Sequence, residues 1–135
     1  MIFSDRFEAG QKLAQKILDD SALSAEFSSL VLAFSPDGNE IAKGVVELLK
    51  IPLADLDNNL DFKDKIVFLI DDGALEKKSL EIAMGKVRGF GPKRIVIAMP
   101  IIAKDSLEEI KNLADQVFYL EALDIFFNVN QFYQK

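Results

Sequence analysis

Residues 66–80 read IVFLIDDGALEKKSL and hold the clearest indication of the fold. Its first five residues are apolar and mostly branched, which is typical of a β-strand covered on both faces. Two acids and a glycine follow at 71–73, and then an amphipathic helical stripe begins. Its apolar positions are Leu80, Ala83, Met84 and Val87. A buried strand that turns into such a helix predicts a parallel sheet with helices packed against it.

Strand and helix patterns alternate along the rest of the chain as well. The other expected strands lie at 29–34, 51–57, 94–100 and 116–120. Helices are expected at 5–20 and 105–114. A further helix is expected to begin at its cap Asn39 and to include Leu49 in its buried stripe, and another to contain Leu80 and to end at Gly89 or Gly91. A chain of 135 residues suits one domain, 1–135. We therefore predict a single three-layer α/β/α domain with a mainly parallel sheet of about five strands.

Composition excludes several classes of function. The sequence contains no cysteine and no histidine, which removes disulfides, thiolate nucleophiles, serine–histidine triads and zinc sites that use those ligands. A formal net charge of −6 argues against nonspecific binding to nucleic acid or to an anionic membrane. The apolar runs are too short to span a bilayer, and the N-terminus carries no signal-peptide pattern. We therefore expect a cytoplasmic protein with neither nucleic acid nor membrane among its partners.

Several segments, in the same order, resemble the type I phosphoribosyltransferases, in particular a stand-alone bacterial branch of that family. FSDRFEAGQKLA at 3–14 fits an opening F-x-D-R-x-E-A-G-x-x-L-A pattern, and VLAFSPDGNEIA at 31–42 is similar to the family's first strand and turn. DDGALEKKS at 71–79 lies over the phosphoribosyl diphosphate (PRPP) signature D-D-G-x-A-T-G-x-T. Segments 91–101 and 114–134 resemble the last two strands and the F-F-x-V-x-x-[WF]-Y ending. The likeness extends over nearly the whole chain.

This resemblance implies a glycosyltransferase that uses PRPP and Mg²⁺. It implies that Asp71 and Asp72 contact the two ribose hydroxyls, a role that suits carboxylates because their charge-assisted hydrogen bonds are strong. It also implies a loop that holds the 5′-phosphate with backbone N–H groups and a hydroxyl at a helix N-terminus. The candidate phosphate loop is Gly73, Ala74, Leu75, Glu76, Lys77, Lys78 and Ser79, and the candidate remnant of the pyrophosphate loop is Ser35, Pro36, Asp37 and Gly38. The pattern identifies no catalytic residue and no metal ligand.

Three departures from the family pattern predict a degenerate member with little or no transfer activity. Glu76 and Lys77 replace the T-G of the phosphate loop, so that a carboxylate stands where a phosphate would lie. At about 4 Å and an effective dielectric of about 20, that repulsion is on the order of 4 kcal/mol. Residues 36–38 replace R-G-G, which removes a cation and adds an acid. Only 57–65 stands where the family carries its flexible loop and hood, so we expect both to be missing.

Both turns also have ordinary structural explanations, which the sequence leaves open. Acids such as those at 71–72 commonly end a strand or cap the next helix. SPDGN at 35–39 has the residues of a tight turn, in which Asn39 caps the following helix. Aromatic residues near the end of the chain suit partial burial together with a homodimer contact. They are Phe126, Phe127, Phe132 and Tyr133.

The sequence thus supports two hypotheses. In the first, a phosphoribosyltransferase-like protein with little or no activity keeps weak binding of PRPP or a nucleoside 5′-monophosphate, with Mg²⁺ as the cofactor if activity or PRPP binding survives. In the second, the chain is a structural or regulatory subunit of a homo- or hetero-oligomer, with a protein partner and no small-molecule ligand. Thermal stabilisation by a ribose 5-phosphate compound without turnover would favour the first, and a concentration-dependent dimer without a ligand response would favour the second.

Overall fold

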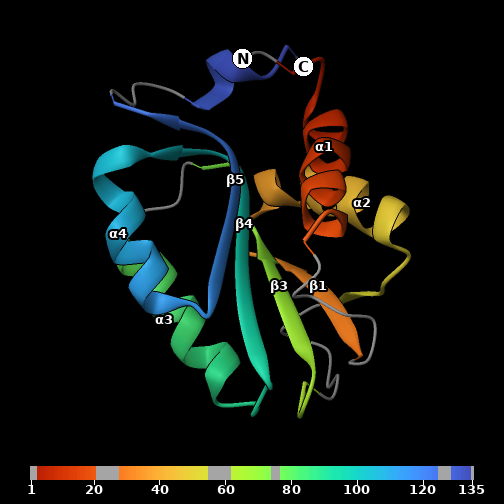
Figure 1. The fold of residues 1–135 in the computed structure, drawn as a ribbon, viewed down its shortest axis with the longest axis vertical. Helices are drawn as coiled ribbons and strands as arrows, with labels where there is room; N and C mark the ends of the chain where they lie inside the picture. The colour runs from red at the N-terminus through yellow and green to blue at the C-terminus, as the bar shows by residue number, and fades with distance from the viewer. Residues whose placement is uncertain (1–2, 21–27, 55–61, 74–76, 125–128, 135) are drawn as a thin grey trace.

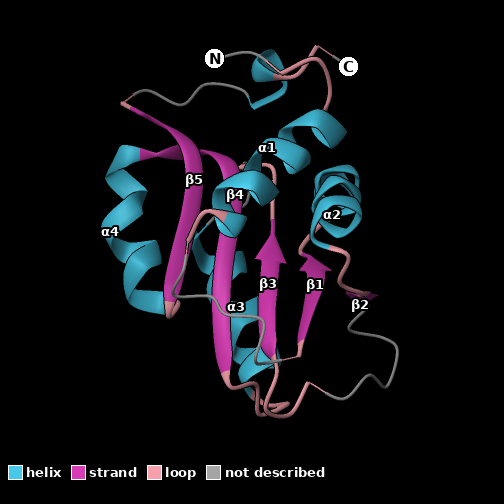
Figure 2. Cartoon of the chain, turned by 45° about the vertical axis from the view of Figure 1, so that its right-hand side comes forward, coloured by secondary structure: helices cyan, strands magenta, loops and turns pink. Residues whose placement is uncertain are grey.

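The structure of the protein, a computed structural model, describes residues 3–20, 28–54, 62–73, 77–124 and 129–134. Within these ranges five strands form one sheet in the order β2-β1-β3-β4-β5, and each neighbouring pair is parallel (Figure 2). The strands are β1 (Ser29–Ala33), β2 (Leu53–Ala54), β3 (Ile66–Ile70), β4 (Arg94–Ala103) and β5 (Gln116–Leu123). The helices are α1 (Arg6–Leu18), α2 (Pro36–Leu49), α3 (Lys77–Arg88) and α4 (Lys104–Leu113), followed late in the chain by a 3₁₀ turn at Val129–Phe132. The predicted α/β fold with a parallel sheet is confirmed.

Helices cover both faces of the sheet. Figure 1 shows α1 and α2 on one side and α3 and α4 on the other. Side chains alternate between the faces along each strand, so that Val31 packs in the core beneath α1 and α2, whereas Leu30 and Leu32 pack in the core on the other side. Among the helices of the described residues, none is both long enough and apolar enough to span a membrane.

The central strand β3 positions the candidate site. All of β3 is buried, and it pairs with 29–33 of β1 on one side and with 94–98 of β4 on the other. Because the strands run in the same direction, the carboxyl ends of β1 and β3 meet at one edge of the sheet, where Ala33 pairs with Ile70. The turns that follow these two strands are the turns in which the sequence places its candidate ligand loops.

The start of α2 differs from the prediction. The helix begins at Pro36, so residues 36–38 form its first turn rather than a loop, and Asn39 lies inside the helix rather than at its cap. Ser35 is the N-cap residue, with an extended backbone at φ −143°. Proline suits the first helical position because its fixed φ is helical and its missing N–H would have no partner there in any case. The prediction was wrong because Pro36 starts a helix as readily as it forms a tight turn.

Strand β4 continues beyond the predicted 94–100 to Ala103, although it contains Pro100. Its pairing with β3 ends at Ala98, and from there on β5 is its partner in the sheet. A proline without an N–H is tolerated where a strand is paired on one side only. The extra length of β4 is therefore supported by β5, which pairs with it as far as Ala103.

Candidate functional site

The candidate site is at the carboxyl edge of the sheet, where the turn after β3 lies beside the start of α2. Two backbone hydrogen bonds fix this arrangement. The Phe34 N–H donates to the Ile70 carbonyl over 3.1 Å, and the Asp71 N–H donates to the Ala98 carbonyl over 3.2 Å. The turn after β3 is thus held to the chain after β1 on one side and to β4 on the other.

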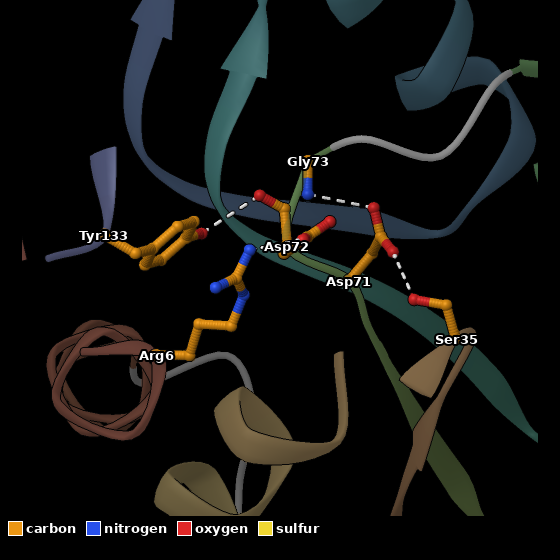
Figure 3. Close-up of polar contacts among 6 residues, drawn as sticks. All are labelled: Arg6, Ser35, Asp71, Asp72, Gly73 and Tyr133. Atoms are coloured by element: carbon orange, nitrogen blue, oxygen red, sulfur yellow. Dashed lines mark hydrogen bonds and ion pairs between the residues drawn. The ribbon is translucent and has the colours of Figure 1, made fainter. Parts of the chain in front are cut away.

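Asp71 is buried in this turn, with 1% of its surface exposed. Its Oδ2 accepts a hydrogen bond of 2.9 Å from the Gly73 N–H, the side-chain-to-backbone contact that Asx turns use. Its Oδ1 lies 3.5 Å from Ser35 Oγ, at the long limit for a hydrogen bond (Figure 3). The carboxylate therefore organises its own turn and connects that turn to the start of α2.

Asp72 is equally buried and contacts residues from both ends of the chain (Figure 3). Its Oδ2 accepts a hydrogen bond of 3.2 Å from Arg6 Nη2, at the start of α1. Its backbone carbonyl accepts a hydrogen bond of 3.0 Å from the Tyr133 hydroxyl. The side chains of Arg6 and Asp72 are 15% and 2% exposed, so water and salt screen this ion pair far less than a surface pair.

Arg6 and Tyr133 also contact each other. The guanidinium carbon lies 4.4 Å from the centre of the Tyr133 ring, within the range of a cation–π contact. Tyr133 stacks in turn on the buried ring of Phe3, with 5.6 Å between ring centroids, and the same two residues form a β-bridge. We call Arg6, Asp72 and Tyr133 the terminal cluster, because it joins both chain ends to the turn after β3.

Burial raises the pKa of the Tyr133 hydroxyl well above its usual value of about 10, because the charged phenolate loses its hydration there. The negative charge of Asp72 raises this pKa further, Arg6 opposes the rise, and Asp71 adds to it. The hydroxyl is therefore protonated at neutral pH, as its donation to the Asp72 carbonyl requires.

Sequence reasoning assigned no site role to Arg6 or Tyr133. Both lie in segments that carry the family resemblance, the opening FSDRFEAG and the closing aromatic segment, and this was the available signal. Arg6 and Asp72 are 66 positions apart, and such a contact leaves no trace in periodicity or composition. Phe132 is partly buried, as expected, and Tyr133 is more deeply buried than expected, whereas Phe126 and Phe127 lie outside the described residues.

Two glycines of the predicted ligand loops lie where the backbone leaves little room for a side chain. Gly73 has φ +104°, and a Cβ there would lie 2.6 Å from the Ile101 carbonyl oxygen. A Cβ at Gly38 would lie 3.0 Å from the Ile70 carbonyl oxygen, because the first turn of α2 packs closely on the end of β3. Each glycine therefore has a packing reason for its position, whatever the loop binds.

The rest of the candidate phosphate loop is described only in part. Ala74, Leu75 and Glu76 lie outside the described residues. Lys77, Lys78 and Ser79 are the first residues of α3, and the side chains of Lys78 and Ser79 are exposed. Among the described residues of the predicted loop, Gly73 contacts the acidic pair through its hydrogen bond to Asp71.

A pocket of about 380 Å³ opens between the N-terminal ends of α1 and α2. Its lining residues are Asp5, Arg6, Phe7, Pro36, Asp37 and Glu40. Acids outnumber bases in this lining, so the pocket itself attracts anions weakly. Asp71 and Asp72 do not line it, and Arg6 is the residue that belongs both to the pocket and to the buried acidic turn.

Comparison with solved structures shows which known proteins share this fold. No protein-family model and no curated protein matches the sequence. Among solved structures, TT1426 of Thermus thermophilus is similar with a TM-score of 0.84 at 19% identity, over 100% of this chain and 91% of that one. A purine phosphoribosyltransferase from Pyrococcus horikoshii has a TM-score of 0.64 at 18% identity, over 95% of this chain and 97% of that one.

A hypoxanthine-guanine phosphoribosyltransferase from Schistosoma mansoni, in complex with IMP, has a TM-score of 0.62 at 16% identity, over 90% of this chain and 66% of that one. Likenesses at these identities establish the fold and leave the activity to be tested. The chain has the α/β fold of the type I phosphoribosyltransferases.

Proposed function

We propose that this chain is a phosphoribosyltransferase-like protein that binds PRPP or a nucleoside 5′-monophosphate weakly and transfers phosphoribosyl groups slowly or not at all. Ribose binding is supported by the shared fold, since structures of this fold include a purine phosphoribosyltransferase and an enzyme in complex with IMP. The observation that supports weak binding is the burial of Asp71 and Asp72. Asp71 and Asp72 are each 1% exposed and bonded within the chain.

A ligand that used these two acids would first have to break existing bonds. Ribose hydroxyls would replace the Arg6 guanidinium on Asp72, and the Gly73 N–H or the Ser35 hydroxyl on Asp71. At Asp72 the exchange gives up a bond in which both partners are charged for one in which a single partner is charged. The acidic pair therefore adds less affinity than two free carboxylates would, and the ligand binds weakly.

Slow transfer is supported by the start of α2. The resemblance puts a positively charged pyrophosphate loop there, whereas this chain enters the helix through Ser35 and Pro36 and exposes Asp37 beside the pocket. Loss of one electrostatic group that stabilises developing charge commonly costs about 100- to 1,000-fold in rate. Asp37, the residue after Pro36, adds repulsion to that loss.

We propose that Mg²⁺ binds together with PRPP and is not held by the protein alone. In the part of the chain that the structure describes, no three acidic side chains are grouped so as to hold a metal. Asp71 and Asp72 offer the oxygen ligands that Mg²⁺ prefers, but each already bonds to a donor within the chain. The residues therefore do not fit a metal site of their own, and Mg²⁺ would come bound to the diphosphate of the ligand.

Calorimetric titration with PRPP plus Mg²⁺, and separately with IMP, tests the proposal. We expect dissociation constants of about 0.1 to 1 mM, equivalent to about −5.5 to −4 kcal/mol. We expect Asp71→Asn to weaken binding several-fold, because it removes a charged acceptor. Asp105→Asn is the matched control, since Asp105 is an exposed acid in the first turn of α4, on the other face of the sheet, and it should bind as the wild type does.

Transfer is measured with PRPP and hypoxanthine or guanine as the acceptor. We expect nucleotide formation close to the background rate. Micromolar affinity with rapid turnover would contradict the proposed loss of activity. Absence of heat at millimolar ligand would contradict the proposed binding and direct the search to protein partners.

A further inference from the structure

We propose that the Arg6–Asp72 ion pair is autoinhibitory: Arg6 separates the acidic turn from the pocket between α1 and α2, and a ribose phosphate must displace Arg6 before Asp72 can bind the ribose. This inference rests on the proposed function and names the contact that regulates its site. Three observations support this inference. They are the position of Arg6, the hydrogen bonds that hold the turn without Arg6, and the charges around the guanidinium.

The position of Arg6 is the first observation. Its side chain lines the pocket, and its Nη2 lies 3.2 Å from Asp72 Oδ2 (Figure 3). The Asp72 side chain is 2% exposed and does not line the pocket. A molecule in the pocket therefore meets the guanidinium before it meets the carboxylate.

The turn after β3 has supports that do not involve Arg6. The Asp72 carbonyl accepts the Tyr133 hydroxyl, Asp71 accepts the Gly73 N–H, and the Asp71 N–H donates to β4. These bonds keep the turn in place when the guanidinium leaves. Displacement of Arg6 is thus a side-chain rotation that uncovers Asp72, and it requires no change in the register of the sheet.

The charges around Arg6 give it a second place to bind. On the acidic turn the guanidinium pairs with Asp72, and the pocket that Arg6 lines is also lined by the acids Asp5, Asp37 and Glu40. A guanidinium that turns toward the pocket exchanges one carboxylate for others, and a bound phosphate would add a further partner. Two arrangements, each with a charge partner, are what a two-state contact requires.

Titration of Arg6→Gln with ribose 5-phosphate, and with PRPP plus Mg²⁺, tests the inference. We expect binding about tenfold or more tighter than in the wild type, the factor for a site that is open in about a tenth of the molecules. The double variant Arg6→Gln/Asp72→Asn should lose this gain, because the acceptor that Arg6 covers is gone. Lys12→Gln is the matched control, since it removes the same charge from the same helix at a lysine paired with an exposed Glu8, and its affinity should match the wild type.

A second measurement keeps Arg6 intact. The chain has two tyrosines and no tryptophan, so in Tyr119→Phe the emission comes from Tyr133. Because the guanidinium lies 4.4 Å from the centre of the Tyr133 ring, its displacement by ribose 5-phosphate should change the Tyr133 emission with the same midpoint as the calorimetric titration.

The outcomes separate the two proposals. Equal affinities of Arg6→Gln and the wild type, a gain that survives in the double variant, or unchanged Tyr133 emission at saturating ligand would each overturn the autoinhibitory pair and leave the proposed binding intact. Absence of ribose phosphate binding in every variant would overturn both proposals.

Discussion

The turns after β1 and β3 lie side by side at the carboxyl edge of the sheet, yet one exposes its acidic side chain to solvent and the other buries its two acidic side chains. After β1 the chain enters α2 at once and exposes Asp37 in the first helical turn. After β3 the chain buries Asp71 and Asp72 and bonds both within the fold. The role of an acid therefore depends on its surroundings and not on its position in a motif, because burial determines whether its charge faces solvent or organises the protein.

What covers each turn explains the difference. Both chain ends reach the turn after β3 through Arg6 and Tyr133, whereas a pocket opens over the start of α2. A buried carboxylate is costly unless hydrogen bonds or an opposite charge compensate it, and an exposed one needs no such compensation. Substitutions in the two turns should therefore differ in their effect on stability, and that difference can be measured.

The largest expected effect is that of Arg6→Gln on the turn after β3. Removal of one partner of a buried ion pair typically costs about 3 to 5 kcal/mol, and the partial exposure of Arg6 favours the lower end of that range. The free energy of unfolding in urea measures it. Lys43→Gln is the control, because Lys43 pairs with Glu40 where both side chains are more than half exposed, and it should cost about 0.5 kcal/mol or less. Similar losses in the two variants would contradict the distinction between buried and exposed pairs.

Gly73→Ala should follow, with a loss of about 2 to 3 kcal/mol in unfolding free energy from the strained φ and the close Ile101 oxygen. Gly38→Ala, in the turn after β1, should cost clearly less because its φ is helical and its nearest contact is longer. Gly85→Ala is the control in open space on α3, where alanine should stabilise the helix by about 0.5 to 1 kcal/mol. A Gly73→Ala variant as stable as the wild type would show that this turn can relax.

The sequence was sufficient for the fold but not for the contacts of the site. Five consecutive apolar residues at 66–70 predicted a strand buried on both faces, because few other environments accommodate such a run. The partners of the acids were not predictable in this way. Arg6 reaches Asp72 across 66 positions, and the boundary of α2 depended on whether Pro36 formed a turn or started a helix. Local patterns specify elements, whereas tertiary contacts at the strand ends specify the site.

Tyr133→Phe should have a moderate effect that depends on pH. It removes the hydrogen bond to the Asp72 carbonyl, which typically costs about 1 kcal/mol near pH 8. The pKa of Tyr133 is higher in the folded than in the unfolded state, so this stabilisation is complete below the unfolded value of about 10. Above it the unfolded chain loses a proton that the folded protein retains, and stability falls by up to about 1.4 kcal/mol per pH unit.

Urea unfolding between pH 8 and 11.5 tests this dependence. The wild type should lose stability above about pH 10 more steeply than Tyr133→Phe, so that the two curves converge and then cross below pH 11.5. Parallel curves for Tyr133→Phe and the wild type would contradict a buried, protonated hydroxyl.

The smallest expected effect is that of Asp37→Asn, and it tests the other side of the comparison. Asp37 is exposed in the first turn of α2, where an acid typically contributes about 0.3 to 1 kcal/mol through the helix dipole. Asp5 and Glu40 line the same pocket and repel it, so we expect a net loss of about 0.5 kcal/mol or less. Asp72→Asn, the same exchange in the turn after β3, should cost several times more because it removes one charge of a buried ion pair. Equal unfolding free energies for these two variants would mean that Asp37 too organises the fold, and the contrast between the turns would fail.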